Sequence, residues 1–227
     1  MFEEFLRAPP IGAAPDLAGQ TRTRTAVRRY ALAKRAFDIT MVLLTAPISL
    51  LLIGMLALMV RSDGGGAFYG QRRLGLDGRV FVLWKLRSMV TDADARLERY
   101  LAANPDARLE WDHTQKLRRD PRVTLVGRYL RKFSLDELPQ LWNVLVGDMS
   151  LVGPRPMFPS QRALYPGTAY FDFRPGLTGL WQISERNDSS FAKRADYDDR
   201  YAECVSFGTD VRIILKTVVV VFRGTGC

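Results

Sequence analysis

The feature that most constrains this chain is an apolar run at residues 39–60. Its sequence, ITMVLLTAPISLLLIGMLALMV, contains no charged side chain. A helix rises about 1.5 Å per residue, so the run can cross a bilayer core of about 30 Å. A cleaved signal peptide fits poorly, because the run is too long, begins too late and lacks a small-residue cleavage site after it. The sequence therefore predicts a membrane segment.

Pro47 lies near the middle of this run and removes a helix hydrogen bond, so a break or kink is expected there. Two geometries compete: a kinked span, and a re-entrant hairpin that returns to its own side. Residues 18–37 contain several Arg and Lys but no acid, and more Arg follow the run at 61, 72, 73 and 79. The positive-inside rule places both flanks in the cytoplasm, which favours the re-entrant geometry. The upstream basic arm is expected to be flexible and to suit anionic lipid headgroups.

The rest of the chain predicts an α+β fold in which a β-hairpin packs on helices. Two β-rich runs flank the turn sequence GLDG at 75–78, and alternation places Lys85 and Arg87 on one face. Helices are expected over 91–116, with a break at Asn104-Pro105, and from 123 to 147, whereas 154–189 is expected to be irregular. An amphipathic helix near the C-terminus fits either a core or a membrane surface. The predicted units are a basic arm at 1–33, a membrane helix at 34–61, a catalytic domain at 62–204 and an amphipathic helix at 205–227.

Composition excludes several function classes. Two Cys cannot build a disulfide framework, and the single His113 leaves no Cys/His metal cluster. The 227 residues carry a net charge of +9, which suits nucleic acid or anionic lipid, but no nucleic-acid motif and no phosphate-binding glycine loop is present. Asp92-Ala93-Asp94 matches the D-x-D pattern of metal-dependent glycosyltransferases, although Asp92 is better explained as a helix N-cap.

The most informative acidic pair lies in Ser134-Leu135-Asp136-Glu137, which has two interpretations. The sequence matches a capping box, with Ser134 as N-cap and Glu137 reaching back to it. Alternatively, Asp136 is a nucleophile toward phosphorus, with a pKa lowered by the helix dipole and by Arg131. In that case the adjacent Glu137 is suited to hold Mg²⁺.

Cations near predicted turns and element ends supply the second half of a phosphate site. Arg155 lies between Pro154 and Pro156, which fix its backbone and lower the entropic cost of placing its guanidinium. Arginine grips phosphate with two parallel hydrogen bonds and lysine acts as a point charge. The candidate phosphate-binding residues are Lys85, Arg87, Arg131 and Arg155.

Several sequence blocks together resemble the bacterial sugar transferases of the monotopic phosphoglycosyl transferase superfamily. The resemblance runs from Lys34 to Thr217 and points to the small members that initiate exopolysaccharide synthesis. The blocks are KRAFD at 34–38, QRRLG at 71–75, KLRSM at 85–89, RKFSLDELPQLWNVLVGDMSLVGPRP at 131–156 and RPGLTGLWQIS at 174–184.

This resemblance implies an enzyme that transfers a sugar-1-phosphate from a UDP-sugar to undecaprenyl phosphate and releases UMP. Galactose and glucose are the expected sugars. Asp136 is the implied nucleophile, which forms a covalent phosphosugar, and Glu137 with Asp136 the implied Mg²⁺ site. The implied phosphate contacts are Lys85, Arg131 and Arg155. Other acids of the family pattern fall on Asp198 and Asp210, as a further part of the substrate site.

The family's membrane helix is re-entrant and broken at a proline, which corresponds to Pro47, with Lys34, Arg35 and Asp38 at its mouth. The implied location is the bacterial inner membrane, with the catalytic domain in the cytoplasm and in contact with lipids but not nucleic acid. The sequence does not choose the sugar, the polymer, or between a monomer and a homo-oligomer. The alternative function is a membrane-anchored, non-enzymatic basic binding module. Departures from the family pattern occur at Gly64-Gly65-Gly66, Gly70, Glu185 and Val205.

Overall fold

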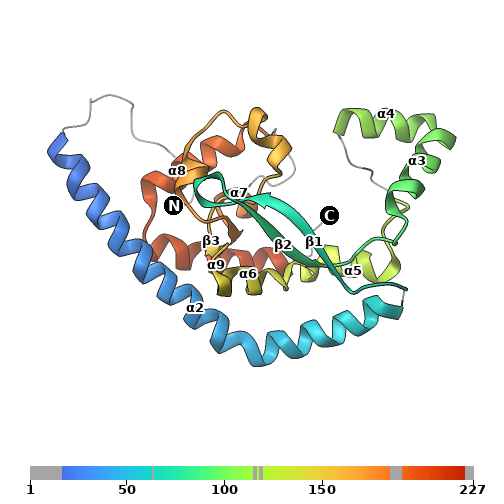
Figure 1. The fold of residues 1–227 in the computed structure, drawn as a ribbon, viewed down its shortest axis with the longest axis horizontal. Helices are drawn as coiled ribbons and strands as arrows, with labels where there is room; N and C mark the ends of the chain where they lie inside the picture. The colour runs from blue at the N-terminus through green and yellow to red at the C-terminus, as the bar shows by residue number, and fades with distance from the viewer. Residues whose placement is uncertain (1–16, 63, 115–116, 118–119, 185–190, 223–227) are drawn as a thin grey trace.

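The structure is a computed structural model that describes residues 17–62, 64–114, 117, 120–184 and 191–222. It combines helices with small sheets, and one long apolar helix runs along a side of the molecule (Figure 1). This confirms the predicted mixture of helix and sheet.

Helix α2 spans Leu17–Ser62 and contains the apolar run. It continues through Pro47 without a break and changes direction part-way along (Figure 1), so of the predicted break or kink the structure has a bend. A proline removes one hydrogen bond and kinks a helix, and strong helix formers on both sides continue it here. The helix also begins upstream of the predicted boundary at Lys34, because residues 17–33 contain no proline to stop it. Residues 1–16 of the arm lie outside the described residues.

The predicted hairpin is confirmed. Strands β1 (Phe68–Leu74) and β2 (Val80–Leu86) pair antiparallel, with Phe68 opposite Leu86 and Leu74 opposite Val80. The short helix η1 (Leu76–Gly78) forms the turn, where Asp77 and Gly78 adopt positive φ values of 57° and 74°. Asp and Gly tolerate this conformation better than other residues, which explains why this turn forms here.

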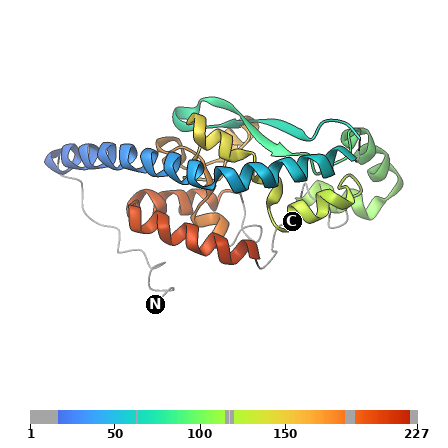
Figure 2. The same ribbon diagram turned by 90° about the horizontal axis from the view of Figure 1, so that it is seen from below.

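The two predicted helical regions are confirmed, each in pieces. Helices α3 (Ala93–Ala103) and α4 (Pro105–Thr114) are separated at Asn104 and project from one end of the molecule in both views (Figures 1 and 2). The second region consists of α5 (Leu125–Lys132), η2 (Leu135–Glu137) and α6 (Gln140–Val146).

The segment predicted to be irregular contains more structure than expected. Strand β3 (Ser150–Val152) pairs in parallel with β4 (Gly176–Thr178), and α7 (Leu180–Ile183) follows. The short helices η3 (Pro159–Leu164) and η4 (Ala169–Asp172) lie between the two strands. Strands of three residues are too short to show a period in the sequence, so their pairing depends on tertiary contacts.

Helices α8 (Arg194–Cys204) and α9 (Phe207–Phe222) complete the described fold. Ile213 of α9 is buried in a core cluster with Trp181 and Tyr201. Leu215 and Val219, on the same helix, are 64% and 51% exposed. One side of α9 is therefore a core face, while another apolar side is uncovered by the described residues.

Candidate active site

The Asp136–Glu137 pair lies in the short helix η2, directly after a backbone reversal. Ser134 has a φ of 54°, in the left-handed region that non-glycine residues seldom adopt, and this ends α5 and redirects the chain. The Ser134 side chain makes no capping hydrogen bond, so the predicted capping box is wrong. Leu135 packs beside Val60, Leu86 and Leu130, which fixes η2 against the end of α2.

Lys85 joins the two carboxylates. Its Nζ lies 2.8 Å from Glu137 Oε1 and 3.5 Å from Asp136 Oδ2. Arg155 approaches the same Glu137 oxygen at 3.6 Å. Strand β2 therefore brings a lysine, and the loop after β3 an arginine, to the predicted acidic pair.

Arg131 reaches this site through a close contact between α5 and the segment that follows β2. Gly127 of α5 packs on the backbone of Ser88, where a Cβ atom would come within 2.0 Å of the Ser88 carbonyl oxygen. One turn later, Arg131 Nε donates a hydrogen bond to Ser88 Oγ at 2.9 Å. Arg131 is also close enough to Asp136 to act on its charge. Three of the four predicted phosphate-binding cations thus gather around the acidic pair.

Burial dominates the electrostatics of Asp136, which is only 8% exposed. Desolvation raises the pKa of its carboxyl, and the charges of Lys85 and Arg131 act in the opposite direction. The predicted lowering of this pKa is therefore wrong. The prediction relied on a helix dipole, but the three-residue η2 supplies little dipole and the aspartate has left water.

Arg87 lies at a different place from the other predicted cations. Its Nη2 donates to the carbonyl oxygen of Val60 at 3.1 Å, which ties the chain just after β2 to the end of α2. Lys85 lies in β2 and contacts the acidic pair, so the two predicted cations reach different places.

The predicted membrane residues bind the rest of the protein. Arg35 donates to the carbonyl oxygens of Val144 and Leu145 at the end of α6. Asp38 is buried and accepts from the Leu151 amide at 3.2 Å. These contacts hold the upstream part of α2 against α6 and β3.

Asp210 and Asp198 are placed in two separate buried networks. Asp210 accepts from Lys34 at 2.5 Å and from Tyr201 at 2.7 Å, and Tyr30 also donates to it. Asp198 accepts from the hydroxyl of Tyr165 at 2.7 Å. The Asp210 network joins α2 to α8 and α9, so the structure gives this residue a connecting position.

Sequence reasoning missed three residues that organise this region. Asn143 accepts from the Trp84 amide at 3.0 Å and donates to the Val82 carbonyl at 2.7 Å, which holds β2 on α6. Arg73 and Arg194 are partly buried beside Arg155. The sequence signal for Arg73 is its place in the QRRLG block, whereas Arg194 follows residues 185–190, including Glu185, which lie outside the described residues.

The predicted Mg²⁺ donors fit that ion in chemistry. Asp136 and Glu137 offer adjacent carboxylates, and Mg²⁺ is commonly held by one or two carboxylates together with substrate phosphates. Within the described residues no group of three or more His, Cys, Asp or Glu side chains forms a cage. The two carboxylates would therefore need substrate phosphates as further ligands to hold Mg²⁺.

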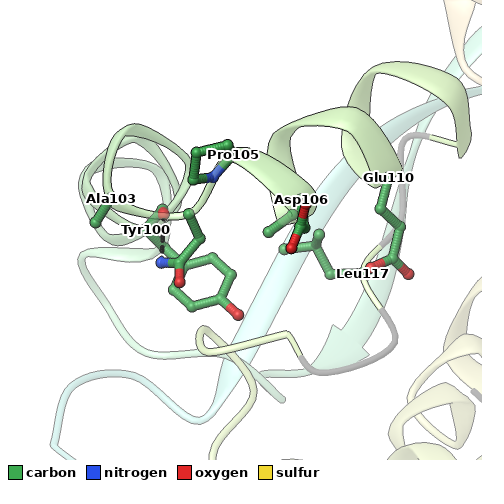
Figure 3. Close-up of a pocket in the computed structure, with 8 residues that line it drawn as sticks. Tyr100, Ala103, Pro105, Asp106, Glu110 and Leu117 are labelled. Carbon is green, nitrogen blue, oxygen red and sulfur yellow. Dashed lines mark hydrogen bonds between the residues drawn. The ribbon is translucent and has the colours of Figure 1, made fainter.

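A separate hollow lies in the α3–α4 hairpin (Figure 3). Its volume is about 410 Å³, and its lining includes Tyr100, Asp106 and Glu110 but no residue of the acidic site. In the D-x-D sequence, Asp92 pairs with Arg99 at 3.0 Å. This end of the molecule is therefore distinct from the Asp136–Glu137 site.

Comparison with known proteins identifies the family of the chain. The family model for bacterial sugar transferases matches residues 29–224. The chain belongs to the bacterial sugar transferase family. This confirms the predicted family and makes the protein an enzyme of the transferase class.

Three curated relatives are similar to most of this chain. It is 48% identical to the exopolysaccharide production protein ExoY of Rhizobium meliloti, over 86% of this chain and 88% of the relative. It is 46% identical to the UDP-galactose-lipid carrier transferase of Erwinia amylovora, over 85% of this chain and 41% of the relative. It is 45% identical to the undecaprenyl-phosphate galactose phosphotransferase of Salmonella typhimurium, again over 85% and 41%. The transferase thus spans less than half of these last two relatives.

Proposed function

We propose that this transferase moves a sugar-1-phosphate from a UDP-sugar, with galactose or glucose as the sugar, to undecaprenyl phosphate and releases UMP. The names of the relatives support the lipid acceptor, a UDP-galactose donor and a role in exopolysaccharide synthesis. The observation that carries the proposal is the pair of buried Asp136 and half-buried Glu137, beside three cations and the end of the apolar helix.

The proposed reaction has two displacements at one phosphorus atom. An Asp136 carboxylate oxygen attacks the phosphorus that bears the sugar, the bond to the bridging oxygen breaks, and UMP leaves with that electron pair. An oxygen of undecaprenyl phosphate then attacks the same phosphorus, and the Asp136 carboxylate is regenerated. A covalent intermediate lets a soluble donor and a membrane-bound acceptor use the site in turn.

The charges around Asp136 suit this chemistry. An anionic donor must approach an anionic carboxylate, and Lys85, Arg131 and Arg155 supply positive charge at that place. Mg²⁺ bound by Glu137 and Asp136 would supply further neutralisation of phosphate charge. Burial of Asp136 removes its hydration shell, and Lys85 opposes the resulting loss of its charged form.

The contacts on both sides of the apolar run in α2 support a re-entrant membrane helix. Arg35 binds α6 near the start of the apolar run, and Val60 contacts β2 and α5 near its end. A helix rising about 1.5 Å per residue would separate Arg35 from Val60 by roughly 38 Å if it were straight, more than a bilayer core. One polar domain that holds both ends cannot lie on both sides of the membrane.

The middle of α2 supplies the surface for lipid. Tyr30–Ser62 is the part of the described chain that is long and apolar enough to cross a membrane, and 11% of its most apolar window is buried in the protein. The exposed apolar side of α9 offers a second lipid contact. We place the transferase on the inner membrane with the Asp136 site in the cytoplasm. Exposed apolar side chains of α2 include Leu43, Leu44, Ile48, Leu51 and Leu58.

UMP release by the full chain in detergent tests the proposal. UDP-galactose and UDP-glucose are each supplied with Mg²⁺, with and without undecaprenyl phosphate. Wild type should turn over only with the lipid and give a stoichiometric UMP burst without it. Asp136→Asn should abolish both. The matched control is Asp94→Asn, which changes an exposed aspartate of the D-x-D sequence and should leave turnover intact.

The opposite outcomes are equally informative. Full activity in Asp136→Asn would exclude the nucleophile, and loss of activity in Asp94→Asn would favour a metal-dependent glycosyltransferase. Salt-sensitive lipid binding in a protein that releases no UMP would support the non-enzymatic basic module instead.

A further inference from the structure

Three arginines from different parts of the chain gather beyond Glu137. Arg73 lies on β1, Arg155 follows β3, and Arg194 begins α8. Arg155 and Arg194 both face the ring of Trp181, with guanidinium carbons 5.6 Å and 4.2 Å from its centroid. The charges of all three act on one another. The fold thus concentrates like charges that would separate in an extended chain.

This concentration of positive charge disfavours the charged forms of the arginines. Burial lowers the pKa of Arg73 and of Arg194 to about 10, and the neighbouring charge of Arg155 lowers both further. The Nε atoms of Arg73 and Arg194 are buried and have no hydrogen-bond partner among the described residues. Buried donors without partners cost free energy, so such a cluster is expected to be completed by an anion.

Aromatic rings hold the guanidiniums in place. Arg73 lies 3.4 Å from the ring centroid of Phe158, and Arg194 lies 4.8 Å from that of Phe191 as well as facing Trp181. Stacking on rings orients a guanidinium and leaves its edge available for a planar grip on an anion.

The arginine cluster lies next to the carboxylates where a diphosphate would react. Arg155 Nη2 is 3.6 Å from Glu137 Oε1, and Arg73 is close enough to Glu137 for the two charges to act on each other. A diphosphate bridge is anionic, so guanidiniums gathered at this place suit it.

The pairing of the hairpin strands indicates whether the three arginines lie near a donor phosphate or near the lipid phosphate. Arg73 pairs with Phe81 across the hairpin. Lys85 lies four residues after Phe81 in β2, on the same face of the strand and about 13 Å from Phe81. Arg87 lies beyond Lys85 and contacts Val60 at the end of the membrane helix. Lys85 and the acidic pair therefore separate the arginine cluster from the end of α2, where a lipid phosphate would arrive.

We propose that Arg73, Arg155 and Arg194 form a subsite for the nucleotide phosphate of the donor, the phosphate that leaves with UMP. The inference rests on the proposed transfer reaction. When the bond to the bridging oxygen breaks, the leaving phosphate gains one negative charge. Arginines fixed at that position bind the departing group more strongly than the intact donor, which accelerates the step.

The test compares Arg73→Gln and Arg194→Gln with wild type in the full chain. The controls are Arg72→Gln on the same strand and Arg200→Gln on the same helix. UMP affinity is measured by calorimetry, and KM is measured separately for the UDP-sugar and for undecaprenyl phosphate. Loss of a charged hydrogen bond should weaken UMP binding about tenfold to a hundredfold. The UDP-sugar KM should rise, with the lipid KM and both controls unchanged.

Arg73→Lys and Arg194→Lys separate ligand binding from a folding defect. Lysine keeps the charge but loses the planar grip, so these variants should recover part of the UMP affinity. Unchanged UMP affinity in the glutamine variants would overturn the subsite, as would a rise in the lipid KM alone. Equal losses in the lysine and glutamine variants with lower unfolding temperatures would overturn it in favour of a structural role.

The same experiment separates the subsite from the reaction. Wild type that binds UMP through Arg73 and Arg194 but never turns over would exclude the proposed function and leave the subsite standing. Normal turnover together with UMP binding that does not depend on these arginines would exclude the subsite and leave the proposed function standing.

Discussion

Two carboxylate-lysine sites in this transferase differ in how completely their charges are matched. At Asp210, one oxygen accepts from Lys34 and Tyr30 and the other from Tyr201, and the residue is 2% exposed. At the acidic pair, Lys85 is shared between Asp136 and Glu137, with one contact at 3.5 Å. The first site is complete and connects helices, whereas at the second one lysine is shared by two carboxylates, an arrangement that we propose binds a further ligand.

Breaking the complete site should have the largest effect on stability. Asp210→Asn leaves the Lys34 ammonium without its counter-charge, and removing one partner of a buried pair costs roughly 3–5 kcal/mol. For a chain of this size, that corresponds to a fall of roughly 6–20 °C in unfolding temperature. Scanning fluorimetry in detergent measures it.

A double variant sharpens this prediction. Lys34→Met with Asp210→Leu removes both charges and should be less destabilised than Asp210→Asn alone, because no buried charge is left unpaired. A double variant as unstable as the single one would mean that the pair matters through its shape and hydrogen bonds rather than its charges.

Glu137→Gln tests the incomplete site, and its main effect should be on activity. The change removes a charge from the proposed Mg²⁺ site, so we expect turnover to fall about a hundredfold and the Mg²⁺ requirement to rise. UMP release over a range of Mg²⁺ concentrations measures both. The exposed Glu98→Gln is the control, and an unchanged Mg²⁺ dependence in Glu137→Gln would contradict the metal assignment.

Asp198→Asn should act on the pH dependence of stability, with little effect on stability near pH 5. Burial raises the pKa of Asp198 to about 7, so between about pH 4 and 7 the native state keeps a proton that the unfolded state has lost. Stability then falls as the pH rises through this range, by up to about 1.4 kcal/mol per pH unit, and levels off above pH 7. The asparagine side chain can still accept the hydrogen bond from Tyr165 but does not titrate. The stability of the variant relative to wild type should therefore rise from pH 5 to pH 8.

Unfolding curves of wild type and Asp198→Asn at several pH values test this directly. Parallel pH profiles would show that Asp198 does not carry the native-state proton.

The contrast between the two sites also explains which predictions from the sequence were correct and which were wrong. The apolar run, the GLDG turn and the acidic pair depend on neighbours in the chain, and the sequence places all three. The pKa of Asp136 depends on burial by distant segments, which is why its predicted direction is wrong. Arg194 is not marked by any local pattern, because Trp181 and Arg155 meet it only after folding.

The sequence by itself determined the long apolar helix, the hairpin and the position of the acidic pair, because residue type and turn chemistry are local properties. Only the tertiary structure decided which charges meet. It assigned Asp210 to a helix connection and Arg87 to the end of α2, and it gathered Arg73, Arg155 and Arg194 beside Glu137. Electrostatic interactions act through space, so their partners follow from the packing of segments that are far apart in the chain.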